Sequence, residues 1–418
     1  MKKRFLAFSV CMAVLLASLT GCYSPQENAP SVPTAPTQAA QTESGSGAEE
    51  PVEIKTYPLP EENVRANIIY VPSPSTGGFW TCAVFNAKTI QAYDPTTKTA
   101  YFPCYQAGCK HNDASCTANF GGVISGFAEY RGNFYAMIYY NDDTASAFVT
   151  RPVSGGPLQI LASWEPENEN EECRCGFYGL SFGKAYLTVS KETYATEDGQ
   201  AVAVKEEYSK CSLDLETGEL VEYMTDEDGY LPYMHGVWGD VAVFQDWYAD
   251  RPDGTPVKRD GSEDYNFRLY SKNLRTGEEK TIVDVTENFV WTADPHVSWG
   301  QYTVYQVDRS VYVYDMETQT SKKLFTHEPG WDFYNYMIQD GHVMVIGGTE
   351  DTCRAWAIDV TDGSVIELDT LGGDVMPFSA HYECNGYFVG LPYDSNNGDQ
   401  YYISKKDYYR SNYDAAFR

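Results

Sequence analysis

The sequence predicts an all-β protein, a seven-bladed β-propeller of four-stranded antiparallel blades. Short segments rich in β-branched and aromatic residues turn sharply into one another at seven glycine-containing sites, as in β-hairpins. These sites recur every 41 to 61 residues, a period typical of one propeller blade. The pivot glycines are Gly78, Gly132, Gly183, Gly239, Gly300, Gly341 and Gly386.

The chain begins with features of an exported lipoprotein. Three basic residues (2–4) precede an apolar run from Phe5 to Leu19, which is too short to span a bilayer and is typical of a signal peptide. The four residues that end at Cys22 resemble a bacterial lipobox. This resemblance implies removal of residues 1–21 and acylation of Cys22, for instance with palmitate. An ordinary signal peptide with a chance cysteine is the alternative.

Residues 22–51 are predicted to form a disordered tether. They consist mainly of Pro, Ser, Thr, Gln, Ala, Gly and Glu, and they have too few large apolar side chains to offset the entropy of ordering the chain. We therefore expect a lipid anchor at Cys22 to hold the propeller, residues 52–418, on the extracytoplasmic side of the cell membrane.

The composition is strongly acidic, with 59 Asp and Glu residues, 30 Lys and Arg residues and a formal net charge of −29. This charge argues against nucleic acids and anionic polymers as partners, and it suits cationic or neutral ligands and divalent metal ions. Of the 11 cysteines, nine remain when Cys11 and Cys22 are set aside. An odd and uneven set is not a disulfide framework, so it indicates either a reducing habitat or a metal site.

The blade around Gly300 illustrates the repeat. Strand-like segments at residues 296–299, 302–307, 310–316 and 322–325 are joined by short turns. Six blades show all four segments, whereas the seventh has no clear fourth one. Because a propeller ring must close, we expect residues 52–57 to supply the outer strand of the seventh blade. A three-stranded last blade is the alternative.

Strand order assigns each connection to one end of the ring. The first–second and third–fourth turns of an antiparallel blade share one end, which we call the tight-turn face. The second–third turns and the connections between blades share the other end, the long-loop face. Long loops on a rigid scaffold commonly carry function, so the long-loop face is the candidate functional surface. Its predicted insertions are residues 105–120, 165–173, 191–205, 225–232, 248–266 and 284–295.

A cysteine-rich segment between the first two blades is the sharpest chemical signal. Cys104, Cys109, His111 and Cys116 provide three thiols and one imidazole within thirteen residues, the ligand set of a structural Cys₃His zinc site. All four positions around such a zinc ion are filled by protein, so the metal would hold a loop in place and would not be catalytic. One disulfide plus a free cysteine is the alternative.

With this segment, the chain resembles a family of lipid-anchored propeller proteins of clostridia-type Firmicutes. The resemblance lies in the lipobox at Cys22, the low-complexity tether and the Cys-x₄-Cys-x-His-x₄-Cys segment that starts at Cys104. It implies the compartment and the fold. Because the family has no assigned role, it implies no chemistry.

Several aromatic rings are expected near the mouth of the central channel. His235 and His296 each lie four residues before a pivot glycine, and His381 and Tyr336 lie five residues before one. All four should therefore be near the start of an innermost strand. They could bind a small ligand or an ion, or they could simply line a wet channel.

The long-loop face is expected to be rich in tryptophans and acidic residues. Exposed indoles beside carboxylates suit sugar rings or peptide side chains. A Ca²⁺ site is a weaker prediction, because no loop has the residue order of a calcium-binding loop. The alternative is that the tryptophans cap the sheets and the acids are solvated. The four tryptophans are Trp164, Trp247, Trp291 and Trp331.

The remaining cysteines are predicted to be small buried residues on strands. Cys173 and Cys175 could instead form half of a metal site. The other members of this set are Cys82, Cys211, Cys353 and Cys384.

The sequence contains no nucleophile elbow, zinc-protease motif, phosphate loop or dinucleotide fingerprint. We therefore predict a non-enzymatic, surface-tethered propeller that binds a sugar or a peptide on its long-loop face. The alternative is a secreted polysaccharide hydrolase or lyase, which would place two carboxylates about 5–10 Å apart at the channel mouth.

Overall fold

A computed structural model describes most of the chain from residue 54 to residue 417. The gaps in the described residues are 68–70, 74–77, 83–87, 96, 112–114, 141–143, 198–199, 227–230, 247–249, 251–253, 255–267, 284–297, 308, 328–331, 350–351, 372–375, 385 and 394–399. The expected signal peptide, the lipidation site Cys22 and the tether lie outside the described residues. Ile54–Arg418 forms one compact unit.

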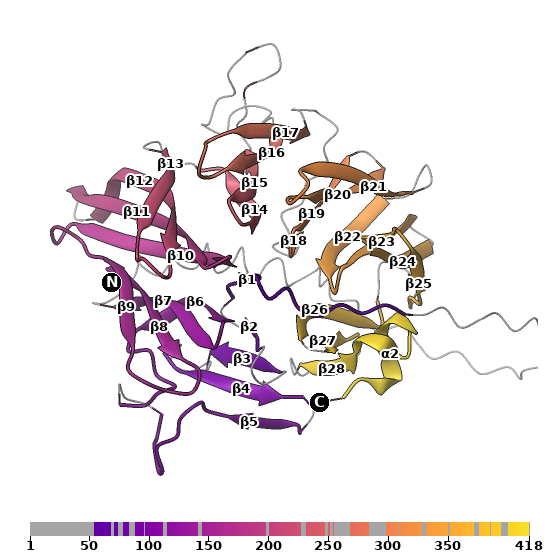
Figure 1. The fold of residues 1–418 in the computed structure, drawn as a ribbon, viewed down its shortest axis with the longest axis horizontal. Coiled ribbons are helices and arrows are strands. Elements are labelled where there is room, and N and C mark those ends of the chain that lie inside the picture. Colours follow the sequence, from indigo (N-terminus) through magenta and orange to yellow (C-terminus); the bar gives the residue numbers. More distant parts are fainter. Residues whose placement is uncertain are drawn as a thin grey trace, which may run out of the picture. The chain divides into compact units, whose positions relative to one another are not determined.

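This unit is a seven-bladed β-propeller, as the sequence predicts. Figure 1 shows seven antiparallel sheets arranged around a common centre. Blade one contains β2 (Val71–Pro72), β3 (Phe79–Cys82), β4 (Ile90–Asp94) and β5 (Thr99–Tyr101). Blade two contains β6 (Val123–Tyr130), β7 (Asn133–Tyr140), β8 (Ala145–Pro152) and β9 (Gln159–Trp164). Blade three contains β10 (Glu171–Ser181), β11 (Lys184–Glu197), β12 (Gln200–Asp214) and β13 (Leu220–Asp226).

The other four blades follow the same order. Blade four contains β14 (Tyr233–Trp238), β15 (Val241–Asp246), β16 (Arg268–Asn273) and β17 (Glu279–Val283). Blade five contains β18 (Ser298–Trp299), β19 (Tyr302–Val307), β20 (Ser310–Asp315) and β21 (Thr320–Thr326). Blade six contains β22 (Asp332–Gln339), β23 (His342–Thr349), β24 (Thr352–Asp359) and β25 (Val365–Leu368). Blade seven contains β26 (Phe378–Cys384), β27 (Tyr387–Pro392) and β28 (Tyr401–Ser404).

All seven pivot glycines lie between the first and second strands of a blade. Strands that are consecutive in sequence are neighbours in every sheet, so the assignment of turns to the two faces holds. Within the described ranges, no helix is long and apolar enough to cross a membrane.

The outer edge of the last blade differs from the prediction. Its sheet has three strands, and residues 54–57 form no strand, so the prediction that residues 52–57 add an outer strand is wrong for the part that the structure describes. The chain instead continues into α2 (Lys405–Tyr409) and the 3₁₀ helix η1 (Tyr413–Ala415). Phe417 then makes a single antiparallel bridge to Tyr402 on the free edge of β28.

Aromatic packing joins blade seven to blade one. Tyr402 stacks on Tyr93 of β4 with the ring centroids 4.7 Å apart, and it also contacts Phe79 of β3. The ammonium group of Lys98 lies 4.4 Å above the ring of Phe417. Side chains therefore close the ring without a shared sheet. Other neighbouring blades are joined by similar apolar layers, such as the contact of Trp80 with Phe134 between blades one and two.

Residues 54–67, which we call the N-terminal strap, cross the tight-turn face. Tyr57 packs against Gly341 at the pivot of blade six, and Pro60 packs against Gly300 at the pivot of blade five. Glu62 pairs with Arg131 beside the pivot of blade two, with a 2.7 Å separation between the charged atoms. The strap therefore covers part of the face that carries the shortest turns.

The strap then enters the centre of the ring. Its strand β1 (Asn63–Arg65) pairs with the innermost strand β10 of blade three, so that this sheet has five strands. Asn67 makes a further bridge to Phe127 on the innermost strand of blade two. Figure 1 shows β1 at the centre of the propeller.

A buried group of charges, which we call the clasp, fixes the strap to the end of the chain. The Lys405 Nζ atom lies 2.8 Å from Asp340 Oδ1 and 3.0 Å from Glu383 Oε2, and only 2% of its side chain is exposed. The backbone N–H of Tyr57 donates a 2.6 Å hydrogen bond to Asp340, and the Tyr409 hydroxyl donates a 3.1 Å bond to the same carboxylate. The clasp therefore joins the strap, blades six and seven, and α2.

Burial and pairing set the pKa values in the clasp. Burial raises the pKa of Asp340 and of Glu383, although Lys405 opposes this effect. Burial lowers the pKa of Lys405, but the two carboxylates more than offset that effect, and its pKa lies above the ordinary value. Lys405 therefore remains charged at neutral pH and is the counter-ion of both acids.

Replacing Gly341 with alanine should destabilise the protein more than the same change at Gly386. Both residues have a positive φ, so both substitutions strain the backbone by about 1–2 kcal/mol. At Gly341 the new Cβ would also lie 2.6 Å from Tyr57 Cδ2, whereas at Gly386 it would meet no atom within 4 Å. We expect about 1–3 kcal/mol of additional destabilisation in urea unfolding. The extra loss should disappear in a Tyr57→Ala background, and equal losses for the two glycines would contradict this contact.

Replacing Lys405 with methionine should lower the free energy of unfolding by about 3–5 kcal/mol, because two buried carboxylates would lose their counter-ion. Lys55→Met is the matched control, since Lys55 pairs with Asp362 but 48% of its side chain is exposed. Urea unfolding of both variants measures the difference. Similar small effects for the two lysines would show that the clasp does not stabilise the ring.

Candidate metal centre and channel residues

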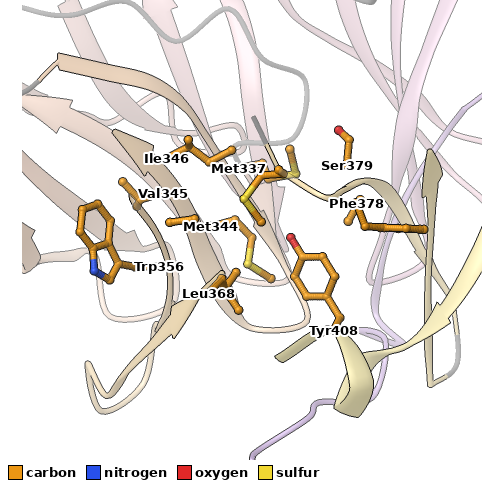
Figure 2. A pocket seen from close by; sticks show the side chains of 12 residues that line it. Met337, Met344, Val345, Ile346, Trp356, Leu368, Phe378, Ser379 and Tyr408 are labelled. Atoms are coloured by element: carbon orange, nitrogen blue, oxygen red, sulfur yellow. The ribbon is translucent and has the colours of Figure 1, made fainter. Parts of the chain in front are cut away.

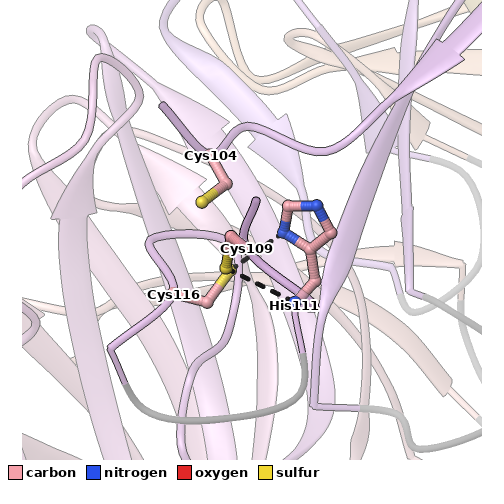
Figure 3. A group of neighbouring side chains, drawn as sticks. All are labelled: Cys104, Cys109, His111 and Cys116. Atoms are coloured by element: carbon pink, nitrogen blue, oxygen red, sulfur yellow. Dashed lines mark hydrogen bonds between the residues drawn. The ribbon is translucent and has the colours of Figure 1, made fainter. Parts of the chain in front are cut away.

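The four residues of the predicted metal site lie together between β5 and β6. The ligand atoms of Cys104, Cys109, His111 and Cys116 are all within 4.8 Å of one another, and Figure 3 shows their side chains converging. Cysteine sulfurs bound to a tetrahedral zinc at about 2.3 Å would be about 3.8 Å apart. The three cysteines are free thiols in the structure. The cluster could therefore hold a metal ion after a small contraction.

Backbone N–H groups point at the sulfur atoms. The N–H of His111 donates to Cys109 Sγ at 3.4 Å, and the N–H of Ala118 donates to Cys116 Sγ at 3.3 Å. The N–H of Gln106 donates in the same way to Cys104, so each cysteine receives a bond from the residue two positions later. Such bonds favour thiolates, the form that binds metals.

The pKa values of two thiols are shifted in opposite directions. Burial raises the pKa of Cys104, but the N–H groups of Gln106 and Thr117, with the neighbouring thiols, lower it to about 6. Burial raises the pKa of Cys116 to about 12, and the nearby Cys104 and Cys109 add to this effect. The cluster therefore readily forms its first thiolate, whereas the innermost sulfur would need a cation nearby to lose its proton.

His111 is held in place by its backbone and by its ring. Its φ of 59° lies in the left-handed region, which a histidine rarely adopts. Its ring stacks on Phe102 at 4.3 Å, and its Nδ1 atom lies 3.3 Å from Cys116 Sγ. Thr89 donates a 3.1 Å hydrogen bond to its carbonyl oxygen. The imidazole is thus directed at the cysteines.

Arg151 of β8 binds the backbone of the cluster segment, a role that the sequence analysis did not predict. Its buried guanidinium group donates to the carbonyl oxygens of Cys116 at 3.3 Å and of Asn119 at 3.0 Å, and also to that of Thr117. The backbone N–H of Ile90 donates a 3.0 Å bond to Ala118. The segment is therefore fixed to blades one and two.

The segment also lies elsewhere than predicted. Residues 105–120 were expected to project from the long-loop face. Tyr105 and Thr117 instead pack beside Gly155, in the third–fourth turn of blade two. Residues 191–197 and 200–205 belong to the long hairpin of β11 and β12, whose end is the second–third turn of blade three.

Most of the remaining cysteines are buried, as the sequence predicts. Cys173, Cys175, Cys211 and Cys384 are free and buried, and none of them belongs to the described metal-ligand cluster. The side chains of Cys82 and Cys353 lie outside the described residues.

The predicted channel histidines occupy β-bulges on innermost strands. His235 lies at a register shift between Met234 and Gly236, and His381 lies at one between Ala380 and Tyr382. A bulge releases one residue from regular pairing and redirects its side chain. The sequence indicated the strand but not the bulge.

His235 and His381 make polar contacts with different residues. His235 is 2% exposed, its Nε2 atom lies 2.6 Å from Gln245 Oε1, and burial lowers its pKa to about 4. His381 is partly exposed, with its ring 3.0 Å from Ser379 Oγ, and its carbonyl accepts a 3.0 Å bond from Gln339. They belong to blades four and seven. His296 and the side chain of Tyr336 lie outside the described residues.

Trp164 ends the outer strand β9 of blade two. It is half-buried and packs against the apolar layer between blades two and three, which fits a residue that caps the sheet. Trp247, Trp291 and Trp331 lie outside the described residues.

Two cavities among the described residues are small. One, of about 30 Å³, lies between blades six and seven and is lined by apolar side chains such as Met337, Met344 and Phe378 (Figure 2). The other, of about 20 Å³, lies next to β1. Pockets for small organic ligands are usually about 300–1,000 Å³, so neither cavity could enclose a sugar or a peptide.

Comparison with known proteins gives the fold alone. Neither a family model nor a curated protein matches the chain. The β-propeller domain of the Trilobed protease from Pyrococcus furiosus is 10% identical, with 82% of this chain and 96% of that chain covered and a TM-score of 0.44. An uncharacterized protein from Listeria monocytogenes is 13% identical, with 84% and 97% covered and a TM-score of 0.42.

The chain spans about half the length of a third similar protein, an acylaminoacyl peptidase from Pyrococcus horikoshii. That protein is 10% identical, with 82% of this chain and 52% of that chain covered and a TM-score of 0.43.

Proposed function

We propose that this chain is a non-enzymatic, surface-tethered β-propeller that binds a sugar or a peptide on its long-loop face. The observation that carries the proposal is the position of the N-terminal strap, which occupies part of the tight-turn face and contacts the pivots of blades two, five and six. At the opposite end, the β11–β12 hairpin extends well beyond the other strands. The long-loop end is therefore the one that the chain's own strap leaves free.

The proposal includes the lipid anchor at Cys22 and the tether of residues 22–51. The support for it is the lipobox-like sequence and the basic and apolar residues before it. Anchored in this way, the propeller would act on the extracytoplasmic side of the cell membrane.

We also propose that the metal in the cysteine cluster is a structural zinc ion. Three thiols and one imidazole suit zinc, and no ligand position would remain for water. Zinc would fasten the segment between β5 and β6 to blade two, where Arg151 already binds its backbone.

Two acidic residues lie close together, and the residues around them support ligand binding over polysaccharide cleavage. Asp340 and Glu383 both lie within about 3 Å of Lys405, so they are as close together as the carboxylates of a glycosidase. However, both are buried, and Tyr57 of the strap hydrogen-bonds to Asp340. This pair therefore serves as a structural counter-ion and offers no surface to a substrate.

If the long-loop face binds the ligand, Trp247→Ala and Trp291→Ala should each weaken binding about tenfold or more, because aromatic side chains dominate recognition sites. The measurement is affinity of the full chain in detergent for a panel of glycans and peptides. Phe182→Ala is the control, since Phe182 is exposed on the tight-turn face. Unchanged affinities for both tryptophan variants would refute the face assignment, and shortened glycan products would refute the non-enzymatic proposal.

Elemental analysis of the purified full chain should find about one zinc ion per chain. Cys109→Ser should lose the metal, because it removes one of four ligands, whereas Cys211→Ser removes a buried thiol outside the cluster and should retain it. Stoichiometric disulfides without metal in the wild-type protein would overturn the zinc assignment.

A further inference from the structure

The small cavity next to β1 lies between the strap and the innermost strands of blades three to five. Its lining includes Arg65 of β1, Tyr178 of β10, Gly236 of β14 and Ser298 of β18. Its volume of about 20 Å³ exceeds the roughly 10–15 Å³ that one water molecule requires. The cavity therefore has room for at least one small species, such as a water molecule or a monatomic anion.

One guanidinium nitrogen of Arg65 lacks a partner. Its Nη1 atom is buried and has no hydrogen-bond partner, and no ion pair joins Arg65 to any carboxylate of the described residues. Arg65 as a whole is only partly buried, and its guanidinium group lies 5.3 Å above the ring of Tyr178. A buried N–H group without an acceptor is costly, so Nη1 favours an acceptor in the cavity.

Neighbouring polar groups are also incompletely paired. The Tyr178 hydroxyl donates to the carbonyl oxygen of His235, and the His235 ring pairs with Gln245. The other ring nitrogen of His235 and the amide nitrogen of Gln245 have no partner, although both side chains are at least 98% buried. If His235 donates to Gln245, the amide N–H groups of Gln245 lack an acceptor. If Gln245 donates to His235, the N–H group on the other ring nitrogen of His235 lacks an acceptor.

We propose that the cavity binds a small monovalent anion of halide size, which is the counter-ion of Arg65. The anion would contact the strap on one side and blades three to five on the other. It would therefore link the strap to the ring at the point where β1 adds to β10. A neutral water molecule is the competing occupant, since it would satisfy Nη1 without balancing its charge.

Diffraction identifies the occupant directly. Crystals of the full chain grown with sodium bromide should show an anomalous peak in the cavity, in contact with Arg65 Nη1. Density for water alone, or a bromide peak only at surface sites, would overturn the proposal. This measurement needs no variant, so it decides the question even if changes at Arg65 prevent folding.

Thermal unfolding provides the second measurement. At equal ionic strength, sodium bromide should raise the melting temperature by about 2 °C relative to sodium gluconate, whose anion is too large for the cavity. Arg65→Gln should abolish this difference. Arg275→Gln is the control, because the side chain of Arg275 is 76% exposed and pairs with Asp240, and it should leave the difference unchanged. An equal halide effect in the Arg65 variant would show that the ion acts elsewhere.

Discussion

The buried clasp at Lys405 is the interaction on which the rest of the structure depends. A propeller needs a bond between its first and last segments, because neighbouring blades otherwise contact each other only through side chains. In this chain a single lysine satisfies two buried acids, and one of those acids also accepts a hydrogen bond from the backbone of Tyr57. Because 283 residues separate Tyr57 from Asp340, the contact closes a loop of chain that contains blades one to five. The clasp thus adds an electrostatic link to the aromatic contact between blades seven and one.

The strap that the clasp holds also makes the two ends of the ring unequal. Tyr57, Pro60 and Glu62 contact the pivots of three blades, and β1 fills the centre beside β10. The tight-turn end is therefore partly covered by the chain itself. The long-loop end carries the second–third turns, among them the turn of the long β11–β12 hairpin.

The sequence predicted the fold well because its main signal is local. Six of the seven pivot glycines have a positive φ, which favours glycine, and at Gly78 a Cβ would lie 2.0 Å from the carbonyl oxygen of Tyr93, so each pivot is visible from a few residues. The metal cluster was predicted for the same reason, since its four ligands lie within thirteen residues. Arg65 and Arg151 were missed, because their roles depend on contacts between distant strands. The closure of blade seven was predicted wrongly, because closure by residues 52–57 was inferred from the missing strand and not from the residues that form the clasp.

Blade one illustrates that contacts other than strand pairing hold neighbouring blades together. Within the described residues, its strands β2 and β5 have only two and three residues. On one side, Tyr402 of blade seven stacks on Tyr93. On the other side, the cysteine segment and Arg151 bind it to blade two. A metal ion at the cysteines would strengthen the junction of blades one and two, since bound metal stabilises only the folded arrangement of its ligands. The position of the cluster is therefore better explained by stability than by catalysis.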